Sequence, residues 1–203
     1  MSTQFREDVK RLRGLIGCGS IILHARPRGG KGTQSRLLAS SVGGVTTSSG
    51  DLSRAADLPP DVAAIRDAGG LIPTEAFFRY VLPGVGGPEY DGKILWLDAV
   101  GRKHGEEAET LRVMEERGHP VLAVVYIDVS EDETRRRGHE GGSRGRVDDT
   151  PEKHEDRLMV FREDTLPVID YYEDLGMLIR INGEQSTASV TSDIVHGLLK
   201  HLG

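Results

Sequence analysis

The chain has 203 residues, of which 37% are hydrophobic and 29% charged, and its formal net charge is -6 at pH 7. This length suffices for one well-buried core and is too short for two complete catalytic domains, so we expect a single domain over residues 1–203. The acidic balance is the wrong sign for a nucleic-acid partner, and no apolar run approaches the length of a membrane span.

The N-terminal segment, residues 1–14, carries charges of both signs and lacks the uninterrupted apolar stretch of a secretory signal, so we expect a short amphipathic helix there. Cys18 follows as the single cysteine, which excludes an internal disulfide and a multi-cysteine zinc site and fits a reducing compartment. Free cysteine packs well when buried, so we expect Cys18 at the edge of the core. Together these features indicate a cytoplasmic protein with no membrane contact.

Short apolar runs alternate along the chain with segments of helical periodicity. The runs that we expect to be strands are residues 21–24, 94–97, 121–127 and 177–181. Helical patterns follow the first two at residues 31–41 and 106–117, and Gly118 stands where a C-terminal stop belongs. Strands that are apolar almost throughout are typical of a parallel sheet covered by helices on both faces. This alternation predicts an α/β fold.

A longer helical pattern begins at Pro151 and extends to Tyr172. Leu158 and Val168 recur in it at helical spacing and are expected in the core, and Pro167 is expected to kink it. Two other regions look like insertions that could act as moving lids: residues 51–70, and the glycine-rich charged residues 138–149. The histidines suggest no ligand set, and we expect His139 and His154 to face solvent.

The segment between the first expected strand and the first expected helix reads Ala25-Arg26-Pro27-Arg28-Gly29-Gly30-Lys31-Gly32-Thr33-Gln34. A glycine-bearing loop in this context presents backbone N–H groups to phosphate oxygens, and the helix N-terminus adds partial positive charge. Lys31 is then expected to reach the β- and γ-phosphates of a nucleotide. The strict P-loop pattern asks for glycine at position 25 and serine or threonine at position 32, and this sequence departs from it at both.

The run Gly30-Lys31-Gly32-Thr33-Gln34 resembles the loop of adenylate kinases, and the likeness can be followed from Ile21 to Leu202. It implies a P-loop three-layer α/β/α fold with a central parallel five-stranded sheet. The core would be residues 19–48, 73–137 and 151–203, with a small monophosphate-binding insertion at about 49–72 and a short lid at about 138–150.

Two residues of this loop, Ala25 and Arg28, stand where the family has glycine. A Cβ is costly at either position if the backbone needs a positive φ. Arg28 also offers an additional guanidinium beside the phosphates.

The resemblance implies two nucleotide sites. The residues that it assigns to ATP are Gly29, Gly30, Lys31, Gly32, Thr33, Gln34, Arg137 and Gln185. Those that it assigns to the acceptor monophosphate are Ser49, Arg54, Leu71, Ile72, Ala99, Arg102 and Glu106. In this interpretation Arg54 and Arg102 hold the acceptor phosphate, and small apolar residues flank its base.

Asp98-Ala99-Val100-Gly101-Arg102 stands where the family has Asp-Gly-Phe-Pro-Arg. Asp98 emerges at the carboxyl edge of an expected parallel strand beside the loop, where Mg²⁺ and its waters need an anion. The resemblance therefore implies Mg²⁺ as the cofactor, held by Asp98 through water, and no zinc.

Glu106 stands where adenylate kinases have a glutamine that reads adenine. A carboxylate accepts hydrogen bonds but cannot donate, so it would leave the acceptor nitrogen of the adenine ring unpaired. Alternatively, Glu106 and Glu107 simply favour the first turn of a helix. The sequence leaves the choice of base open between these two interpretations.

Gly145-Arg146-Val147-Asp148-Asp149, followed by Arg157, resembles the short lid of cytosolic adenylate kinases, whose arginines supply charge to the transferring phosphoryl group. A further lid arginine of the family falls on Gly141 here, with Arg144 nearby as a replacement. The implied catalytic set is Lys31, Asp98, Arg102, Arg146 and Arg157.

The resemblance thus implies a monomeric phosphotransferase that moves the γ-phosphoryl group of ATP to a nucleoside monophosphate, with AMP as the first expectation. One alternative keeps the chemistry and changes the acceptor to another nucleoside monophosphate, such as one specific to a pathway. A second alternative is a nucleotide-binding protein with little turnover. Retention of Lys31, Asp98 and Arg102 argues against the second.

Overall fold

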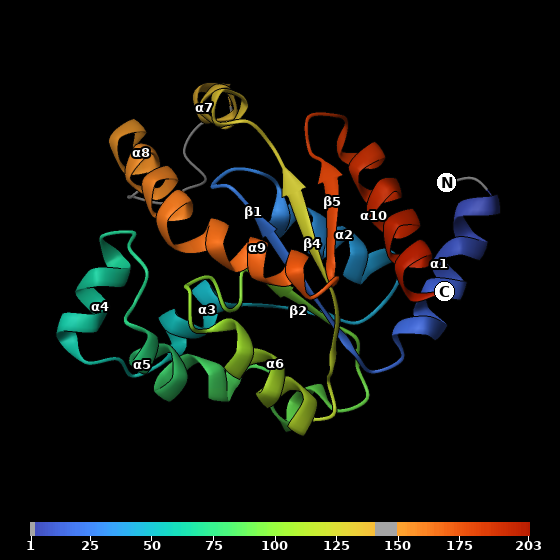
Figure 1. The fold of residues 1–203 in the computed structure, drawn as a ribbon, viewed down its shortest axis with the longest axis horizontal. Helices are drawn as coiled ribbons and strands as arrows, with labels where there is room; N and C mark the ends of the chain where they lie inside the picture. Colours follow the sequence, from blue (N-terminus) through green and yellow to red (C-terminus); the bar gives the residue numbers. More distant parts are fainter. Residues whose placement is uncertain (1–2, 141–149) are drawn as a thin grey trace.

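The computed structural model describes residues 3–140 and 150–203, and a parallel sheet lies at its centre (Figure 1). Its strands are β1 (Ser20–Ala25), β2 (Val45–Ser48), β3 (Leu95–Asp98), β4 (Val121–Asp128) and β5 (Leu178–Asn182). They are arranged in the order β2-β3-β1-β4-β5, and every neighbouring pair is parallel. The expected five-stranded sheet is confirmed. Four strands coincide with the apolar runs, whereas β2 lies at the edge of the sheet and had no such run.

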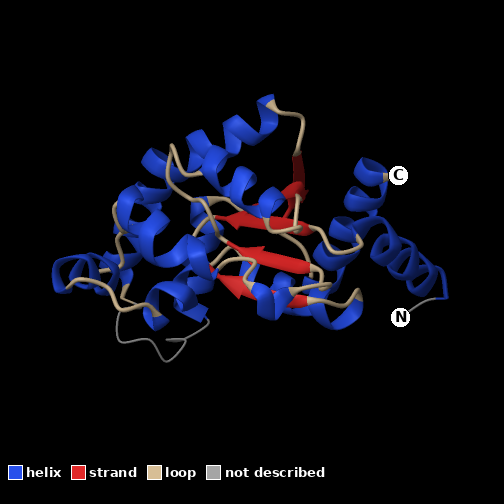
Figure 2. Ribbon diagram, turned by 90° about the horizontal axis from the view of Figure 1, so that it is seen from below, coloured by secondary structure: helices blue, strands red, loops and turns tan. Residues whose placement is uncertain are grey.

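Helices cover both faces of the sheet (Figure 2). On one face lie α1 (Thr3–Ile16), α2 (Lys31–Ser41) and α10 (Thr187–Leu202). Their buried side chains, among them Leu12, Leu38 and Ile194, pack against Trp96 and other strand residues in one hydrophobic cluster. The indole N–H of Trp96 donates to the carbonyl of Gly43 at 2.8 Å, which satisfies its only polar group.

The opposite face is covered by α6 (Glu107–Glu116) and α9 (Leu166–Asp174), with an irregular helical stretch that runs from α5 (Thr74–Ala76) through a π-helical turn at Phe77–Val81 to a 3-10 turn at Leu82–Gly84. A further 3-10 turn, Pro88–Tyr90, precedes β3. The central strand β1 is buried at every position, as expected for a strand covered on both faces. Two large hydrophobic clusters, together with a small third one formed by Tyr126, Phe161 and Ile169, therefore hold the sheet between its helix layers, and its carboxyl edge remains for the loops.

The long C-terminal helical pattern forms three pieces: α8 (Pro151–Val160), a π-helical turn at Phe161–Thr165, and α9. At its start, the Thr150 hydroxyl accepts from the backbone N–H of Lys153 at 3.3 Å, and Pro151 occupies the first turn. Pro167 has no backbone N–H, and its ring crowds the carbonyl of Glu163, four residues earlier. Glu163 lies in the π-helical turn, which is wider than an α-helical turn. The expected irregularity at Pro167 is thus present as a π-helical turn just before it.

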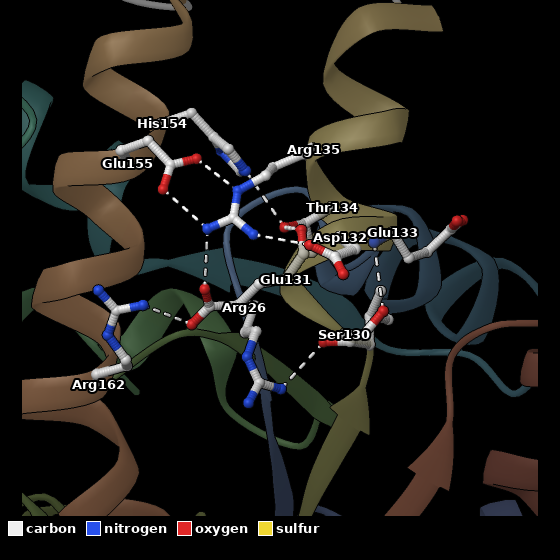
Figure 3. Close-up of polar contacts among 11 residues, drawn as sticks. Arg26, Ser130, Glu131, Asp132, Glu133, Thr134, Arg135, His154, Glu155 and Arg162 are labelled. Carbon is white, nitrogen blue, oxygen red and sulfur yellow. Dashed lines mark hydrogen bonds and ion pairs between the residues drawn. The ribbon is translucent and has the colours of Figure 1, made fainter.

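Beside this core lies the segment that contains α3 (Ser49–Ala55) and α4 (Pro60–Asp67), and α4 lies at the edge of the molecule in Figure 1. The expected lid, residues 138–150, lies mostly outside the described residues. The helix before it, α7 (Glu131–Glu140), packs beside α8. Arg135 of α7 makes two hydrogen bonds to the carboxylate of Glu155 in α8, at 2.7 and 2.9 Å, and Glu131 accepts from Arg162 at 2.7 Å (Figure 3). These ion pairs are largely exposed, so their main effect is to orient α7 against α8 rather than to stabilise the fold strongly.

Two expectations about single side chains are wrong. Cys18 is exposed, because it lies in the turn between α1 and β1, after Gly17 with a φ of 60°. His154 is only 3% exposed, because it lies on the face of α8 that packs against α7, where its Nε2 is 3.2 Å from the Thr134 hydroxyl (Figure 3). Among the helices that the structure describes, none is both long and apolar enough to span a membrane.

Candidate active site

The loop between β1 and α2 is built around two residues with positive φ, Arg28 at 63° and Gly30 at 97°. Gly30 begins the helix, because its carbonyl accepts from the N–H groups of Thr33 and Gln34, both at 3.0 Å. Arg26 ties the loop to the end of β4 by donating to the Asp128 carboxylate at 2.9 Å. The N-terminus of α2 is therefore held at the carboxyl edge of the sheet, where the partial positive charge of a helix end favours an anion.

A cavity of about 700 Å³ opens over this loop. Its described lining has seven cationic side chains against three acidic ones, in a chain whose net charge is -6. The cationic residues are Arg28, Lys31, Arg36, Arg54, Arg66, Arg102 and Arg157. Such a local excess of positive charge favours a polyanionic ligand.

A second cavity, of about 610 Å³, lies on the other side of the loop. Arg137 and Gln185 line it, and it shares Arg28, Gly30 and Thr33 with the first cavity. Both volumes are in the range of small-molecule sites. A single ligand could therefore extend from one cavity to the other across the loop.

Asp98 closes the first cavity from the end of β3, which pairs directly with β1. A Cβ at position 32 would lie 3.0 Å from the Asp98 Oδ2 atom, so glycine in the first turn of α2 is what lets this carboxylate approach. A carboxylate oxygen beside the phosphate-binding loop is a suitable hard ligand for Mg²⁺ or for a water bound to it.

The backbone after Asp98 takes an unusual course. Ala99 has a φ of 56° and Gly101 a φ of 64°. Proline, which the resemblance places at 101, is fixed near a φ of -65° and could not adopt this conformation. The Ser49 hydroxyl donates to the Ala99 carbonyl at 2.6 Å and holds this backbone against the start of α3.

Glu106, immediately before α6, holds the other end of the same loop. Its Oε2 atom accepts from the backbone N–H groups of Arg102 at 3.1 Å and Lys103 at 3.2 Å. The side chain is 4% exposed, and burial raises the pKa of its carboxyl to about 7, although the N–H donors and the Arg102 charge oppose the shift. Glu106 thus fixes the backbone that carries Arg102, which neither interpretation of the sequence anticipated. It also lines the first cavity.

Arg102 and Arg157 converge on the first cavity from different elements. Burial lowers the pKa of the Arg102 guanidinium, Asp98 and Glu106 oppose this, and the nearby charge of Arg157 lowers it further. The Arg157 Nε atom also lies 3.3 Å from the position that a Cβ at residue 69 would occupy, at the end of the first insertion. Two guanidinium groups that line the same cavity and act on each other electrostatically favour an anion between them.

Comparison with known proteins identifies the family. The family model described as Adenylate kinase matches residues 23–177. The chain belongs to the adenylate kinase family. It is similar to the adenylate kinase of Prochlorococcus marinus (strain MIT 9211), with 34% identity over 174 residues that cover 83% of this chain and 90% of the relative.

Two further relatives cover slightly more of the chain. Adenylate kinase 1 of Nostoc sp. (strain PCC 7120) is 34% identical over 180 residues, 86% of this chain and 95% of the relative. The adenylate kinase of Deinococcus deserti is 34% identical over 191 residues, 88% of this chain and 95% of the relative. Adenylate kinases transfer a phosphoryl group from ATP to AMP, so the chain is a phosphotransferase of the nucleoside monophosphate kinase class.

All seven residues that the adenylate kinase resemblance assigned to the acceptor are brought together. Ser49, Arg54, Leu71, Ile72, Ala99, Arg102 and Glu106 all line the first cavity. Arg54 pairs with Asp51 in the same helix, α3, and its side chain is 48% exposed. Arg146, with Gly141 and Arg144, lies outside the described residues.

The residues assigned to ATP divide between the two cavities. Lys31 and Gly32 line the first cavity, Gly29, Gln34, Arg137 and Gln185 line the second, and Gly30 and Thr33 line both. Arg137 is held by Glu133 at 2.8 Å and by the Gly183 carbonyl at 2.7 Å, and Gln185 donates to Asp193 at 2.6 Å. The buried side chain of Gln34 is engaged by α10, because it donates to the Thr187 carbonyl at 3.0 Å and accepts from the Thr191 hydroxyl at 2.7 Å.

Three basic residues of the first cavity were not expected from the sequence: His24, Arg36 and Arg66. Arg36 could have been predicted from the sequence, because it lies four residues after Gly32 and therefore on the same face of α2. His24 is fully buried in β1, where burial and the charges of Lys31 and Arg102 lower its pKa to about 3, and no described group bonds its Nε2 atom. Arg66 donates to the Ser53 carbonyl at 2.6 Å, a contact between α4 and α3 that has no local sequence signal.

Proposed function

We propose that this chain transfers the γ-phosphoryl group of ATP to AMP, with the two nucleotides bound end to end across the loop at residues 29–34. The adenosine of ATP occupies the second cavity, its triphosphate lies along the N-terminus of α2, and AMP occupies the first cavity. The observation that carries this assignment is the pair of cavities that share the loop, one of them lined by seven described cationic side chains.

Phosphoryl transfer requires little covalent help from a protein and depends on alignment and charge neutralisation. Lys31 contacts the transferring γ-phosphoryl group, Arg102 and Arg54 hold the phosphate of AMP, and Arg157 neutralises charge from the opposite side. Arg146 completes this set from the lid. Arg102 and Arg157 line the same cavity, which supports an anion at this point.

The acceptor base lies between Leu71, Ile72 and Glu106. Because the Oε2 atom of Glu106 is engaged by two backbone N–H groups, its other oxygen is the one that faces a ligand. In the ionised state this oxygen accepts from the amino group of adenine, and Ala99 leaves room beside it. Gln185 and Arg137 flank the ATP base, while the backbone of Gly29, Gly30, Gly32, Thr33 and Gln34 follows the phosphates.

The residues around Asp98 fit Mg²⁺. Magnesium is held in phosphoryl-transfer sites by one or two carboxylates together with substrate phosphates and water. Asp98 supplies such a carboxylate, and its close approach to Gly32 directs it toward the first turn of α2. When bound with ATP, Mg²⁺ would neutralise charge on the phosphates, and Asp98 would orient one of its waters.

Residues 49–72 and the lid at about 138–150 act in this proposal as closing elements over the core of residues 19–48, 73–137 and 151–203. The protein acts in this proposal as a monomer. Its partners are ATP and AMP, and the single cysteine fits work in the reducing cytoplasm.

The test is ADP formation from ATP and Mg²⁺ with AMP, GMP, CMP, UMP or a deoxynucleotide as the acceptor. The wild type should prefer AMP, and Lys31→Ala should lower kcat by about 10² or more, as expected for a lost contact to the transferring group. Lys93→Ala, which removes an exposed lysine outside both cavities, is the matched control. Wild-type turnover in Lys31→Ala, or a preference for a pyrimidine nucleotide, would refute the proposal.

A further inference from the structure

Arg28 combines a strained backbone with a side chain directed at the nucleotide cavities. Its φ of 63° lies in the left-handed region, where a Cβ is unfavourable and glycine is preferred. Strained residues persist where the surrounding structure holds them, and they cluster at functional sites. The position therefore carries an arginine at a cost to stability that glycine would avoid.

The side chain of Arg28 extends from the loop to α7. Its Nη1 atom lies against the backbone of Gly138 so closely that a Cβ there would overlap it. Glycine in a helix lowers helical stability relative to alanine, and Gly138 leaves the space that the guanidinium of Arg28 occupies. The guanidinium consequently bridges the phosphate-binding loop and the helix that precedes the lid.

Arg28 is also the one charged side chain, among the described residues, that lines both cavities. The surrounding charges are mostly positive: Lys31 in the loop, and Arg136 and Arg137 on α7. Glu133 is the nearby carboxylate of that helix, and its two oxygens accept from Arg136 and Arg137. A polyphosphate that crosses from one cavity to the other would pass this cationic group.

We propose that Arg28 is a further phosphate-binding residue, whose guanidinium contacts the triphosphate of ATP where it passes from the second cavity into the first. This inference rests on the proposed function. A planar guanidinium matches two phosphate oxygens, and it keeps its charge in a partly dry site. By bridging the loop and α7, Arg28 couples the bound triphosphate to the helix that leads into the lid.

The test compares Arg28→Ala, Arg28→Gly and Arg28→Lys with the wild type. Alanine and glycine should each weaken ATP binding and lower kcat/KM for ATP by about 10-fold to 10²-fold, while the KM for AMP changes less than about twofold. Arg28→Lys keeps the positive charge but lacks the paired N–H donors of a guanidinium, so it should retain more ATP binding and kcat/KM than the alanine and glycine variants. Arg6→Ala on α1, which removes an exposed arginine outside both cavities, is the control.

Thermal unfolding separates this role from a structural one. Since Arg28→Gly relieves the positive φ, its Tm should exceed that of Arg28→Ala by about 2–4 °C, as expected for a change of this kind in a chain of this size. Arg28→Gly should therefore be more stable than Arg28→Ala, although its kcat/KM for ATP is lower than that of the wild type. Loss of stability in both variants with unchanged kcat/KM for ATP would overturn the proposal, and so would an equal loss for ATP and AMP.

Calorimetric titration of ATP keeps this test distinct from that of the proposed function. If the wild type binds ATP and transfers to no monophosphate, the proposed function fails, and the affinity ratio between wild type and Arg28→Ala still tests Arg28. A ratio near one would refute the role of Arg28 alone. Failure of the wild type to bind ATP at millimolar concentration would refute both.

Discussion

Ala99 is a residue whose backbone conformation can be tested by itself. Its φ of 56° is unfavourable for any side chain with a Cβ, and Ser49 holds its carbonyl. Ala99→Gly should raise the free energy of unfolding by about 0.5–1 kcal/mol, after allowance for the greater freedom of glycine in the unfolded chain. Urea denaturation measures the change.

The matched control for Ala99→Gly is Ala39→Gly, at a regular helical position in α2. There the same substitution should lower the free energy of unfolding by about 1 kcal/mol. If both variants lost stability to the same extent, the left-handed conformation of Ala99 would be contradicted.

Glu106 makes stability depend on pH. Its folded-state pKa is about 7 against an ordinary 4.5, so the folded protein holds the proton more tightly than the unfolded chain does. Its contribution is fully present below pH 4.5 and is lost as pH rises to 7, by at most about 3 kcal/mol. Glu106→Gln cannot ionise, so its stability relative to the wild type should increase from pH 4.5 to pH 7 and then level off.

Denaturant unfolding at several pH values between 4.5 and 8 tests this expectation, with Glu115→Gln on the exposed face of α6 as the control for a lost charge. If the difference in free energy of unfolding between Glu106→Gln and the wild type stays constant with pH, burial does not raise the pKa of the Glu106 carboxyl. The amide can still accept from the two backbone N–H groups, so the loop that carries Arg102 should be retained.

At the scale of elements, the buried side chain of Gln34 joins α2 to α10 through Thr187 and Thr191. Gln34→Leu removes both hydrogen bonds and leaves buried partners unsatisfied, so it should lower the free energy of unfolding by about 1–3 kcal/mol. Thr191→Val removes only one of the two partners of Gln34, so it should lower the free energy of unfolding by less than Gln34→Leu does. Chemical denaturation of the two variants is the measurement, and unchanged stability in Gln34→Leu would contradict the link between the helices.

The main elements could be predicted from the sequence because they follow simple patterns. Fully covered strands such as β1 are apolar at almost every position, and the first helix after the loop has clear ends. The edge strand β2, Val-Thr-Thr-Ser, is half exposed and polar, so its hydrogen bonds to β3 leave no hydrophobic pattern. Its place in the sheet depends on tertiary contacts.

The site could be predicted in part, and the reason differs from residue to residue. Lys31 and Asp98 lie within recognisable local motifs next to strands. Arg66 and His24 reach the cavity only through the packing of distant segments, and the engagement of Gln34 by α10 joins residues more than 150 positions apart. The anchoring of Glu106 to the backbone required the actual course of the loop after Asp98.

For the whole molecule, the contrast between an acidic chain and a cationic cavity defines where a nucleotide can bind. The net charge of -6 repels anions from most of the surface, whereas the seven cationic side chains around the loop attract them. The two cavities meet at this loop, and each of them brings cationic side chains to it.

The most direct test of this arrangement is calorimetric titration with a dinucleoside polyphosphate, in which one linked molecule carries two adenosines joined by five phosphates. The wild type should bind one molecule per chain, in competition with both ATP and AMP, and Lys31→Ala should bind it at least about tenfold more weakly. Binding of two molecules per chain, competition with only one nucleotide, or undiminished affinity in Lys31→Ala would contradict a single site that spans both cavities.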